Sequence, residues 1–209
     1  MAQDIIPITD DISYLPASTA PLSCDVVFIK SSGCTWIFDV GACPDAACAI
    51  NGISGKKNIV ISHFHQDHTG NLPLVSYDNL FVSGYTEKHV HAGTVISDQA
   101  FFDDVKVFPM PSSHAKGCLA LVHGDYAFLG DGAFCKYKGN SRLYNVQILN
   151  DMISFMENLP CKYFALDHEK KFIQQKEMMI AIYKKIYSNR KQGEPYINVN
   201  GFFSDRDFL

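Results

Sequence analysis

The sequence lacks the features that mark nucleic-acid-binding and membrane-spanning proteins. Its 18 Lys and Arg residues against 22 Asp and Glu residues give a formal net charge of −4, so no basic excess would draw the chain to nucleic acid or to anionic lipid. No apolar run approaches the roughly 18–20 residues that a membrane-spanning helix needs. The first residues also lack the basic and then apolar order of a signal peptide. We therefore expect a cytoplasmic protein that acts on a small-molecule substrate and binds neither nucleic acid nor membrane.

The sequence also lacks a Cys-x-x-Cys pair, although it contains seven cysteines. An odd number of cysteines without such pairs argues against a disulfide framework, a zinc knuckle and a thioredoxin-type redox site. We expect free and mostly buried thiols, because an unpaired cysteine behaves as a small apolar residue.

No segment rich in Pro, Gly or Ser divides the chain, so 209 residues with 47% hydrophobic content predict a single domain over residues 1–209. Short runs rich in Val, Ile and Phe predict strands, and apolar spacings of three and four predict helices. The predicted strands are residues 5–8, 25–30, 35–40, 58–62, 80–83, 105–108, 118–123, 126–130 and 162–166, and the predicted helices are residues 143–159 and 172–187. Strands dominate early and alternate with helices late, which favours an α+β fold of two face-to-face sheets with helices outside.

Three histidines and an aspartate fall within six residues, His63-Phe64-His65-Gln66-Asp67-His68, directly after a predicted buried strand. If the chain stays extended for one more step, His63 and His65 project to the same side, as a shared metal requires. If the chain then turns, Asp67 and His68 can point back at a second metal beside the first. Zn²⁺ prefers such imidazole and carboxylate ligands, so the motif predicts a metal site.

The motif resembles that of the metallo-β-lactamase-fold hydrolases, in particular the branch with the glyoxalase II type thioesterases. In that family the motif is followed along the chain by one His, a bridging Asp and a final His, and this sequence has His114, Asp131 and His168 in that order. The resemblance implies a four-layer αββα sandwich of the metallo-β-lactamase type. It also implies two metal sites, one held by His63, His65 and His114 and one by Asp67, His68 and His168, with Asp131 bridging both.

Two aspartates at predicted strand ends fit this arrangement. Asp131 lies in Gly130-Asp131-Gly132, where the glycines permit a close backbone approach, and two cations would compensate a buried carboxylate there. Asp39, in Phe38-Asp39-Val40-Gly41, resembles a family motif, and we expect it either to hold a ligand imidazole by its other nitrogen or to be an ordinary turn residue.

The resemblance implies a hydrolase that uses two Zn²⁺ ions, with iron or manganese as possible substitutes. We expect a metal-bridging hydroxide to attack a small ester, thioester, lactone or amide, with Asp67 as the catalytic residue that orients this hydroxide. Two alternatives stay open on the same fold. One is a mononuclear iron oxygenase or redox protein that uses only His63, His114 and Asp131, and the other is a metallo-phosphodiesterase.

Several other residues have less specific interpretations. His89 and His91 are interpreted as part of an exposed helix face, and His123 as a hairpin residue, so all three stay outside the predicted site. Lys136, Tyr137 and Lys138 lie just after Asp131 and could either bind an anionic substrate or form a solvated loop. In the C-terminal tail, residues 189–209, the aromatic side chains are expected to pack on the domain or to form a homodimer contact; these are Phe202, Phe203 and Phe208.

Overall fold

The structure is a computed structural model that describes residues 3–31 and 33–202. The chain forms two compact units, residues 1–100 and residues 101–209, and each is described by itself. Within the described ranges, no helix combines the length and the apolar character that a membrane span requires. The prediction of a single domain over residues 1–209 stays a prediction.

The first unit contains a seven-stranded sheet with the order β1-β2-β5-β6-β7-β8-β9. The pairs from β6 to β9 are parallel, and the pairs from β1 to β6 are antiparallel. The strands are β1 (Ile6–Pro7), β2 (Ile12–Leu15), β5 (Val26–Ser31), β6 (Cys34–Phe38), β7 (Lys56–Val60), β8 (Asn79–Val82) and β9 (Thr94–Val95), with a separate hairpin of β3 (Ser18–Thr19) and β4 (Leu22–Ser23). Parallel strands place their carboxyl ends at one edge, and the His63–His68 motif follows β7 at that edge.

Helices cover part of this sheet. The helices of the unit are α1 (Pro44–Gly52), α2 (Gln66–Thr69), the 3₁₀ turn η1 (Leu72–Leu74) and α3 (Gly84–Val90). Helix α1 has Pro44 in its first turn, where the missing N–H costs nothing, and it buries Ala46 and Ile50 in one cluster with side chains of the sheet. At the start of α3 the Ser83 hydroxyl accepts a hydrogen bond from the Thr86 N–H, which is a typical N-cap.

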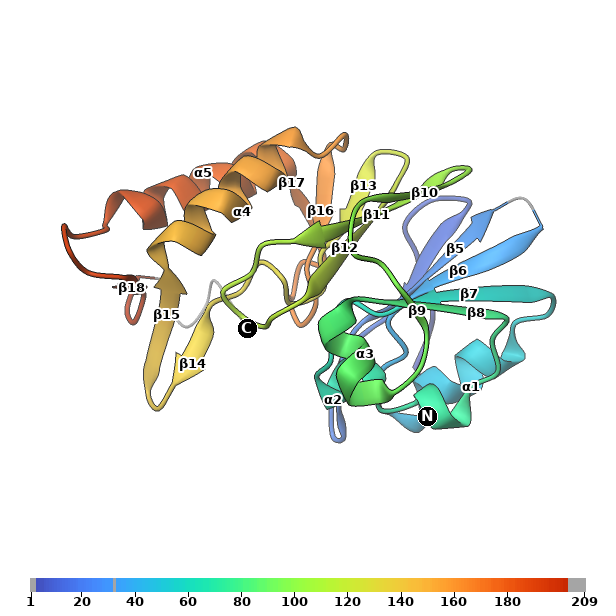
Figure 1. Ribbon diagram of the computed structural model, residues 1–209. Helices are drawn as coiled ribbons and strands as arrows, with labels where there is room; N and C mark the ends of the chain where they lie inside the picture. Colours follow the sequence, from blue (N-terminus) through green and yellow to red (C-terminus); the bar gives the residue numbers. More distant parts are fainter. Residues whose placement is uncertain (1–2, 32, 203–209) are drawn as a thin grey trace. The chain divides into compact units, whose positions relative to one another are not determined.

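The second unit contains a six-stranded and a three-stranded sheet. The first is ordered β10 (Ala100–Phe102), β11 (Val105–Met110), β12 (Cys118–His123), β13 (Tyr126–Phe128), β16 (Tyr163–Ala165) and β17 (Ile173–Gln175), and the second is ordered β14 (Lys136–Lys138), β15 (Ser141–Asn145) and β18 (Tyr196–Asn198). Helices α4 (Val146–Asn158) and α5 (Lys176–Ser188) pack side by side (Figure 1). Their buried faces form one core cluster with residues of β12, β13 and β16.

All nine strands predicted from the sequence are present, each with its ends within two residues of the predicted ends, and both late helices are present. The helix predicted over 143–159 begins at Val146, because Leu143 and Tyr144 belong to strand β15, which pairs with β18. The helix predicted over 172–187 likewise begins at Lys176, after strand β17. These two helix starts were therefore predicted too early.

The cysteines and the C-terminal tail agree with the sequence analysis where the structure describes them. All seven cysteines are free thiols and four are buried. Phe202 packs against the core cluster of the second unit, as predicted for packing on the domain. Phe203 and Phe208 lie outside the described residues, and the homodimer contact stays a prediction.

Candidate metal centre

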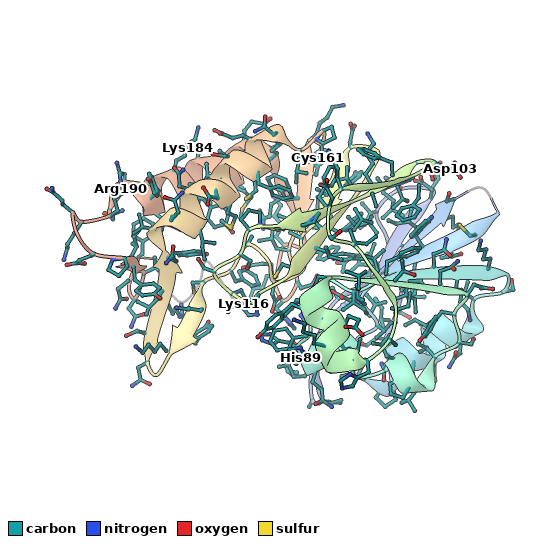
Figure 2. The ribbon with its side chains drawn as sticks, viewed as in Figure 1. His89, Asp103, Lys116, Cys161, Lys184 and Arg190 are labelled. Carbon is teal, nitrogen blue, oxygen red and sulfur yellow. The ribbon has the colours of Figure 1, made fainter. Side chains whose placement is uncertain are left out.

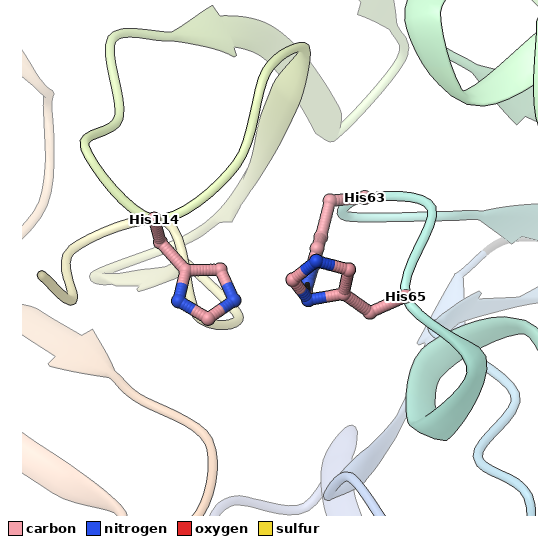
Figure 3. Close-up of side chains that lie close together, drawn as sticks. All are labelled: His63, His65 and His114. Carbon is pink, nitrogen blue, oxygen red and sulfur yellow. Dashed lines mark hydrogen bonds between the residues drawn. The ribbon is translucent and has the colours of Figure 1, made fainter. Parts of the chain in front are cut away.

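The first two predicted ligands face each other on the loop that follows β7. The Nε2 atom of His63 lies 2.8 Å from the Nδ1 atom of His65, and Figure 3 shows the two rings in this arrangement. His63 is fully buried, so its ring has one fixed environment. The prediction that these side chains project to the same side is therefore confirmed, and the facing ring nitrogens can share a hydrogen or present two lone pairs to a cation.

The chain then turns into the short helix α2, which carries Asp67 and His68. The turn brings the Oδ2 atom of Asp67 to 3.6 Å from the Nε2 atom of His68. His68 is fully buried, whereas the Asp67 side chain keeps 15% of its surface exposed. The motif thus supplies two donor pairs in the first unit, by which we mean His63 with His65 and Asp67 with His68. The chain turns after His65, as the spacing predicted.

Asp39 holds His68 from the opposite side of the ring. Its Oδ2 atom lies 2.8 Å from the His68 Nδ1 atom, and its Oδ1 atom accepts a hydrogen bond of 2.7 Å from the Ser62 backbone N–H. The backbone of Asp39 has a φ of 61°, a left-handed conformation that aspartate tolerates better than most residues. The predicted contact is confirmed: Asp39 engages the Nδ1 atom of His68, and the Nε2 atom faces Asp67. That His68 is a metal ligand supported in this way stays a prediction.

In the second unit Asp131 lies between two histidines. Its Oδ2 atom is 3.4 Å from the Nε2 atom of His114, and its Oδ1 atom is 3.9 Å from the Nε2 atom of His168. His114 follows strand β11, and His168 follows β16 with a φ of 62°, a strained backbone of the kind that is common at functional sites. The structure therefore brings together all three ligands predicted in this unit, with one carboxylate oxygen toward each histidine.

The glycines around Asp131 have the role that the sequence predicted. Gly130 has a φ of 54°. A Cβ atom at Gly132 would lie 2.8 Å from the Met110 sulfur and 2.9 Å from the Leu129 carbonyl oxygen. The backbone can turn so tightly next to Asp131 only because these positions carry no side chain.

The same three ligands line a pocket of about 240 Å³ in the second unit. Its wall includes Tyr137 and Arg142 from the β14–β15 hairpin, where these two residues are directly paired and the Arg142 guanidinium lies 5.9 Å from the Tyr137 ring. Glu169 also lines the pocket, and burial raises the pKa of its carboxyl group to about 7, although the neighbouring His168 acts in the opposite direction. The pocket therefore combines the Arg142 guanidinium, the carboxyl groups of Asp131 and Glu169, and apolar side chains.

Sequence reasoning missed Arg142 and Glu169. For Arg142 a signal was present, because Gly139-Asn140 is a two-residue hairpin turn of a common type, and that turn pairs Arg142 with Tyr137. For Glu169 the only signal is its place directly after His168.

The three histidines left outside the predicted site are placed as follows. His89 is exposed on α3 (Figure 2), where its Nδ1 atom lies 2.9 Å from the Tyr85 carbonyl oxygen and its ring stacks on Phe64. His91 is exposed and follows the end of α3 in a left-handed conformation. His123 ends β12 at its hairpin with β13, as predicted, and is buried.

Comparisons with known proteins agree with the resemblance. Residues 19–96 match the family model described as the metallo-beta-lactamase superfamily, a range that includes the His63–His68 motif. A search of curated proteins found no match.

Solved structures show which fold the chain has. The metallo-β-lactamase from Erythrobacter litoralis is similar with a TM-score of 0.64 at 9% identity, over 88% of this chain and 97% of that chain. The metallo-β-lactamase from Hirschia baltica is similar with a TM-score of 0.64 at 10% identity, over 88% and 98%. A B3 metallo-β-lactamase described as the first with an active-site glutamic acid has a TM-score of 0.65 at 11% identity, over 89% of each chain.

The chain therefore has the metallo-β-lactamase fold, and the α+β fold class and the resemblance to this superfamily are confirmed. The closer likeness to glyoxalase II stays a prediction. The donors also suit the metal that the resemblance implies, because imidazole nitrogens and carboxylate oxygens are the groups that zinc accepts. These His and Asp residues are candidate metal ligands.

Proposed function

We propose that the protein is a hydrolase that uses two zinc ions and acts on a small ester, thioester, lactone or amide. One zinc ion would be held by His63, His65 and His114, the other by Asp67, His68 and His168, and Asp131 would contact both. This assignment follows the order of the ligands along the chain. It is also supported by the fold, which the chain shares with known metallo-β-lactamases.

The observation that carries the proposal is the placement of Asp131. Each of its carboxylate oxygens lies nearest to a different histidine, at 3.4 Å from His114 and 3.9 Å from His168. Because His114 belongs to one predicted ligand set and His168 to the other, Asp131 would be placed to contact a metal ion held by either set. The arrangement of Asp131 therefore favours two metals over the mononuclear iron alternative.

When bound, such a metal pair lowers the pKa of a coordinated water to near neutral and polarises the substrate carbonyl. The chain's own residues then position the reactants. Asp67 keeps part of its carboxylate exposed and accepts a hydrogen bond from the attacking water, which orients the water's lone pair toward the carbonyl carbon. Asp39 contacts the Nδ1 atom of His68 and so restrains the orientation of this ring.

The pocket of the second unit would bind the rest of the substrate. Phe134 and Val199 line the pocket with apolar side chains, and Arg142 lines it with a positive charge. Among residues 3–31 and 33–202, no carboxylate forms an ion pair with Arg142, so its guanidinium can receive an anionic group of the substrate. Substrates with a carboxylate some distance from the scissile carbonyl fit this pocket best.

The experiment that tests the proposal is a hydrolysis screen with esters, thioesters, lactones, amides and a phosphodiester on one zinc-containing preparation. We expect turnover of at least one carbonyl substrate, and His68→Ala should reduce kcat by about 100-fold or more, as expected when a main source of transition-state stabilisation is removed. His91→Asn is the matched control, because His91 is exposed and asparagine tolerates its left-handed backbone. Wild-type activity of His68→Ala across the panel would contradict the proposal.

A further inference from the structure

The hydroxyl of Ser62 contacts two histidines that belong to different donor pairs. Its Oγ atom lies 3.0 Å from the Nδ1 atom of His63 and 3.2 Å from the Nδ1 atom of His68. All three residues are buried, with 1% of Ser62 exposed and none of either histidine. Because water does not reach this oxygen, its hydrogen bonds are made within the protein.

The position of Ser62 is itself fixed. Its backbone N–H donates to the Oδ1 atom of Asp39 at 2.7 Å, and the other oxygen of the same carboxylate lies 2.8 Å from His68. Asp39 therefore holds both the serine backbone and one of the two rings that the serine hydroxyl contacts. The centroids of the His63 and His68 rings are only 4.2 Å apart, so a rotation of one ring affects the space of the other.

A hydroxyl group suits this position for a chemical reason. It has one hydrogen to donate and two lone pairs to accept with. A neutral imidazole that uses its Nε2 lone pair for a metal carries one hydrogen on Nδ1. The Nδ1–H of His63 can donate to the serine oxygen, and the Nδ1–H of His68 can be shared between that oxygen at 3.2 Å and Asp39 at 2.8 Å. A methyl or a hydrogen in place of the hydroxyl would remove this acceptor from the His63 Nδ1–H, and it would leave His68 with only one of its two contacts at Nδ1, that with Asp39.

We propose that Ser62 is a positioning residue that couples the two metal positions, because one oxygen atom sets the orientation of a ligand for each. This inference rests on the proposed function, which assigns His63 to one metal and His68 to the other. The first metal to bind fixes one imidazole, and through the Ser62 hydroxyl and the adjacent ring it also prepares the second imidazole. Binding of the two metals is therefore positively cooperative in the wild-type protein.

The test is a titration of metal-free protein with Co²⁺, followed by its visible absorption, for the wild type, Ser62→Ala and Ser62→Thr. We expect cooperative uptake of two ions by the wild type. In Ser62→Ala both dissociation constants should rise, by about 10- to 100-fold for the site with His63, the range seen when partners of metal ligands are removed, and by less for the site with His68, which keeps Asp39; uptake should become stepwise. Ser62→Thr retains the hydroxyl and should restore cooperative uptake.

Ser83→Ala is the matched control, because Ser83 is also a buried serine of the first unit whose hydroxyl makes local hydrogen bonds, with Thr86. It should lower stability without changing Co²⁺ uptake. A second measurement, the ¹⁵N NMR shifts of the histidine rings in the metal-free protein, does not depend on metal or on activity. Ser62→Ala should move the signals of both His63 and His68, and Ser83→Ala should move neither.

Either of two results would overturn the inference about Ser62: Co²⁺ uptake by Ser62→Ala like that of the wild type, or weakening of one site with the other unchanged. These results leave the proposed function standing, because the wild type would still take up two ions and hydrolyse its substrate. A wild type that binds two ions cooperatively without hydrolysing any substrate in the panel would instead contradict the proposed function and support the coupling.

Discussion

Asp39 and His68 are 29 positions apart in the sequence, and the Oδ2 atom of one lies 2.8 Å from the Nδ1 atom of the other, with both side chains fully buried. The same carboxylate also accepts the Ser62 N–H. One aspartate at the end of β6 therefore fixes the start and the end of the ligand segment that follows β7. The orientation of the His68 ring and the position of the Ser62 backbone therefore depend on Asp39.

Replacing Asp39 should reduce stability in a graded way. Asp39→Ala removes the acceptor of two buried donors and places alanine in a left-handed backbone, so we expect a loss of about 3 kcal/mol in the free energy of unfolding. Asp39→Asn tolerates this backbone and keeps one acceptor oxygen, so about 1–2 kcal/mol should be lost. Urea unfolding measures both, and Asp98→Ala, at an exposed position, is the control. Equal stability of Asp39→Ala and Asp98→Ala would contradict the role given to Asp39.

The backbone next to Asp131 should not tolerate a side chain at Gly132. Gly132→Ala places a Cβ atom 2.9 Å from the Leu129 carbonyl oxygen and 2.8 Å from the Met110 sulfur, and a backbone oxygen cannot move aside without distorting the turn. We expect a loss of about 1–3 kcal/mol in unfolding free energy, together with lower activity. Gly52→Ala, at the end of α1 with open space around it, should keep or raise stability. Thermal unfolding of both variants distinguishes the close contact from a general effect of losing glycine.

Arg142 should determine the preference for anionic substrates. In Arg142→Ala the KM for a substrate with a distant carboxylate should rise by about 10- to 100-fold, the value of a charge-assisted hydrogen bond, whereas the KM for its neutral methyl ester should change little. Steady-state kinetics on this matched pair of substrates measures the difference. Arg190→Ala is the control, because Arg190 lies over the Tyr187 ring just beyond α5 (Figure 2). An equal change in KM for both substrates would show that Arg142 does not discriminate between the charged and the neutral substrate.

Cys161 should react with alkylating agents as a weakly acidic thiol. Burial raises the pKa of this thiol from 9.0 to about 11, although Lys176 acts in the opposite direction. Since the thiolate is the reactive form, the alkylation rate of the native protein should still rise about tenfold between pH 9 and pH 10. In urea-unfolded protein, where the thiol has its ordinary pKa of 9.0, the rate should rise only about twofold over the same interval. Mass spectrometry of the Cys161 peptide follows the reaction, and a native rate that likewise rises only about twofold would contradict the effect of burial.

The sequence indicated the candidate metal ligands more fully than the residues that contact them. Residues His63 to His68 are consecutive, so strand and turn geometry predict how they face each other. The double contact of Ser62 was not predictable in this way, because it depends on α2 returning His68 beside His63. The contact of Asp39 with a ligand imidazole was expected from the sequence. Its left-handed backbone conformation was not, because the neighbouring residues do not indicate it.

Strand β15 shows why some boundaries were wrong. Leu143 continues the apolar spacing of the following helix, and a pattern of this kind does not distinguish a strand end from a first helical turn. What decides the conformation is pairing with β18, more than 50 residues later, where Leu143 lies opposite Asn198. The Val146 N–H likewise bonds the Pro195 carbonyl. Contacts between distant segments override local preference here.

The central claim is that seven side chains hold two zinc ions for hydrolysis. Elemental analysis of protein purified without added metal, paired with the same analysis of Asp131→Ala, tests it most directly, because Asp131 lies nearest to both His114 and His168. The account predicts about two zinc ions per wild-type chain and, since Asp131 would contact both metals, substantial loss of both ions from Asp131→Ala. One iron ion per wild-type chain, or two zinc ions retained in Asp131→Ala, would contradict it.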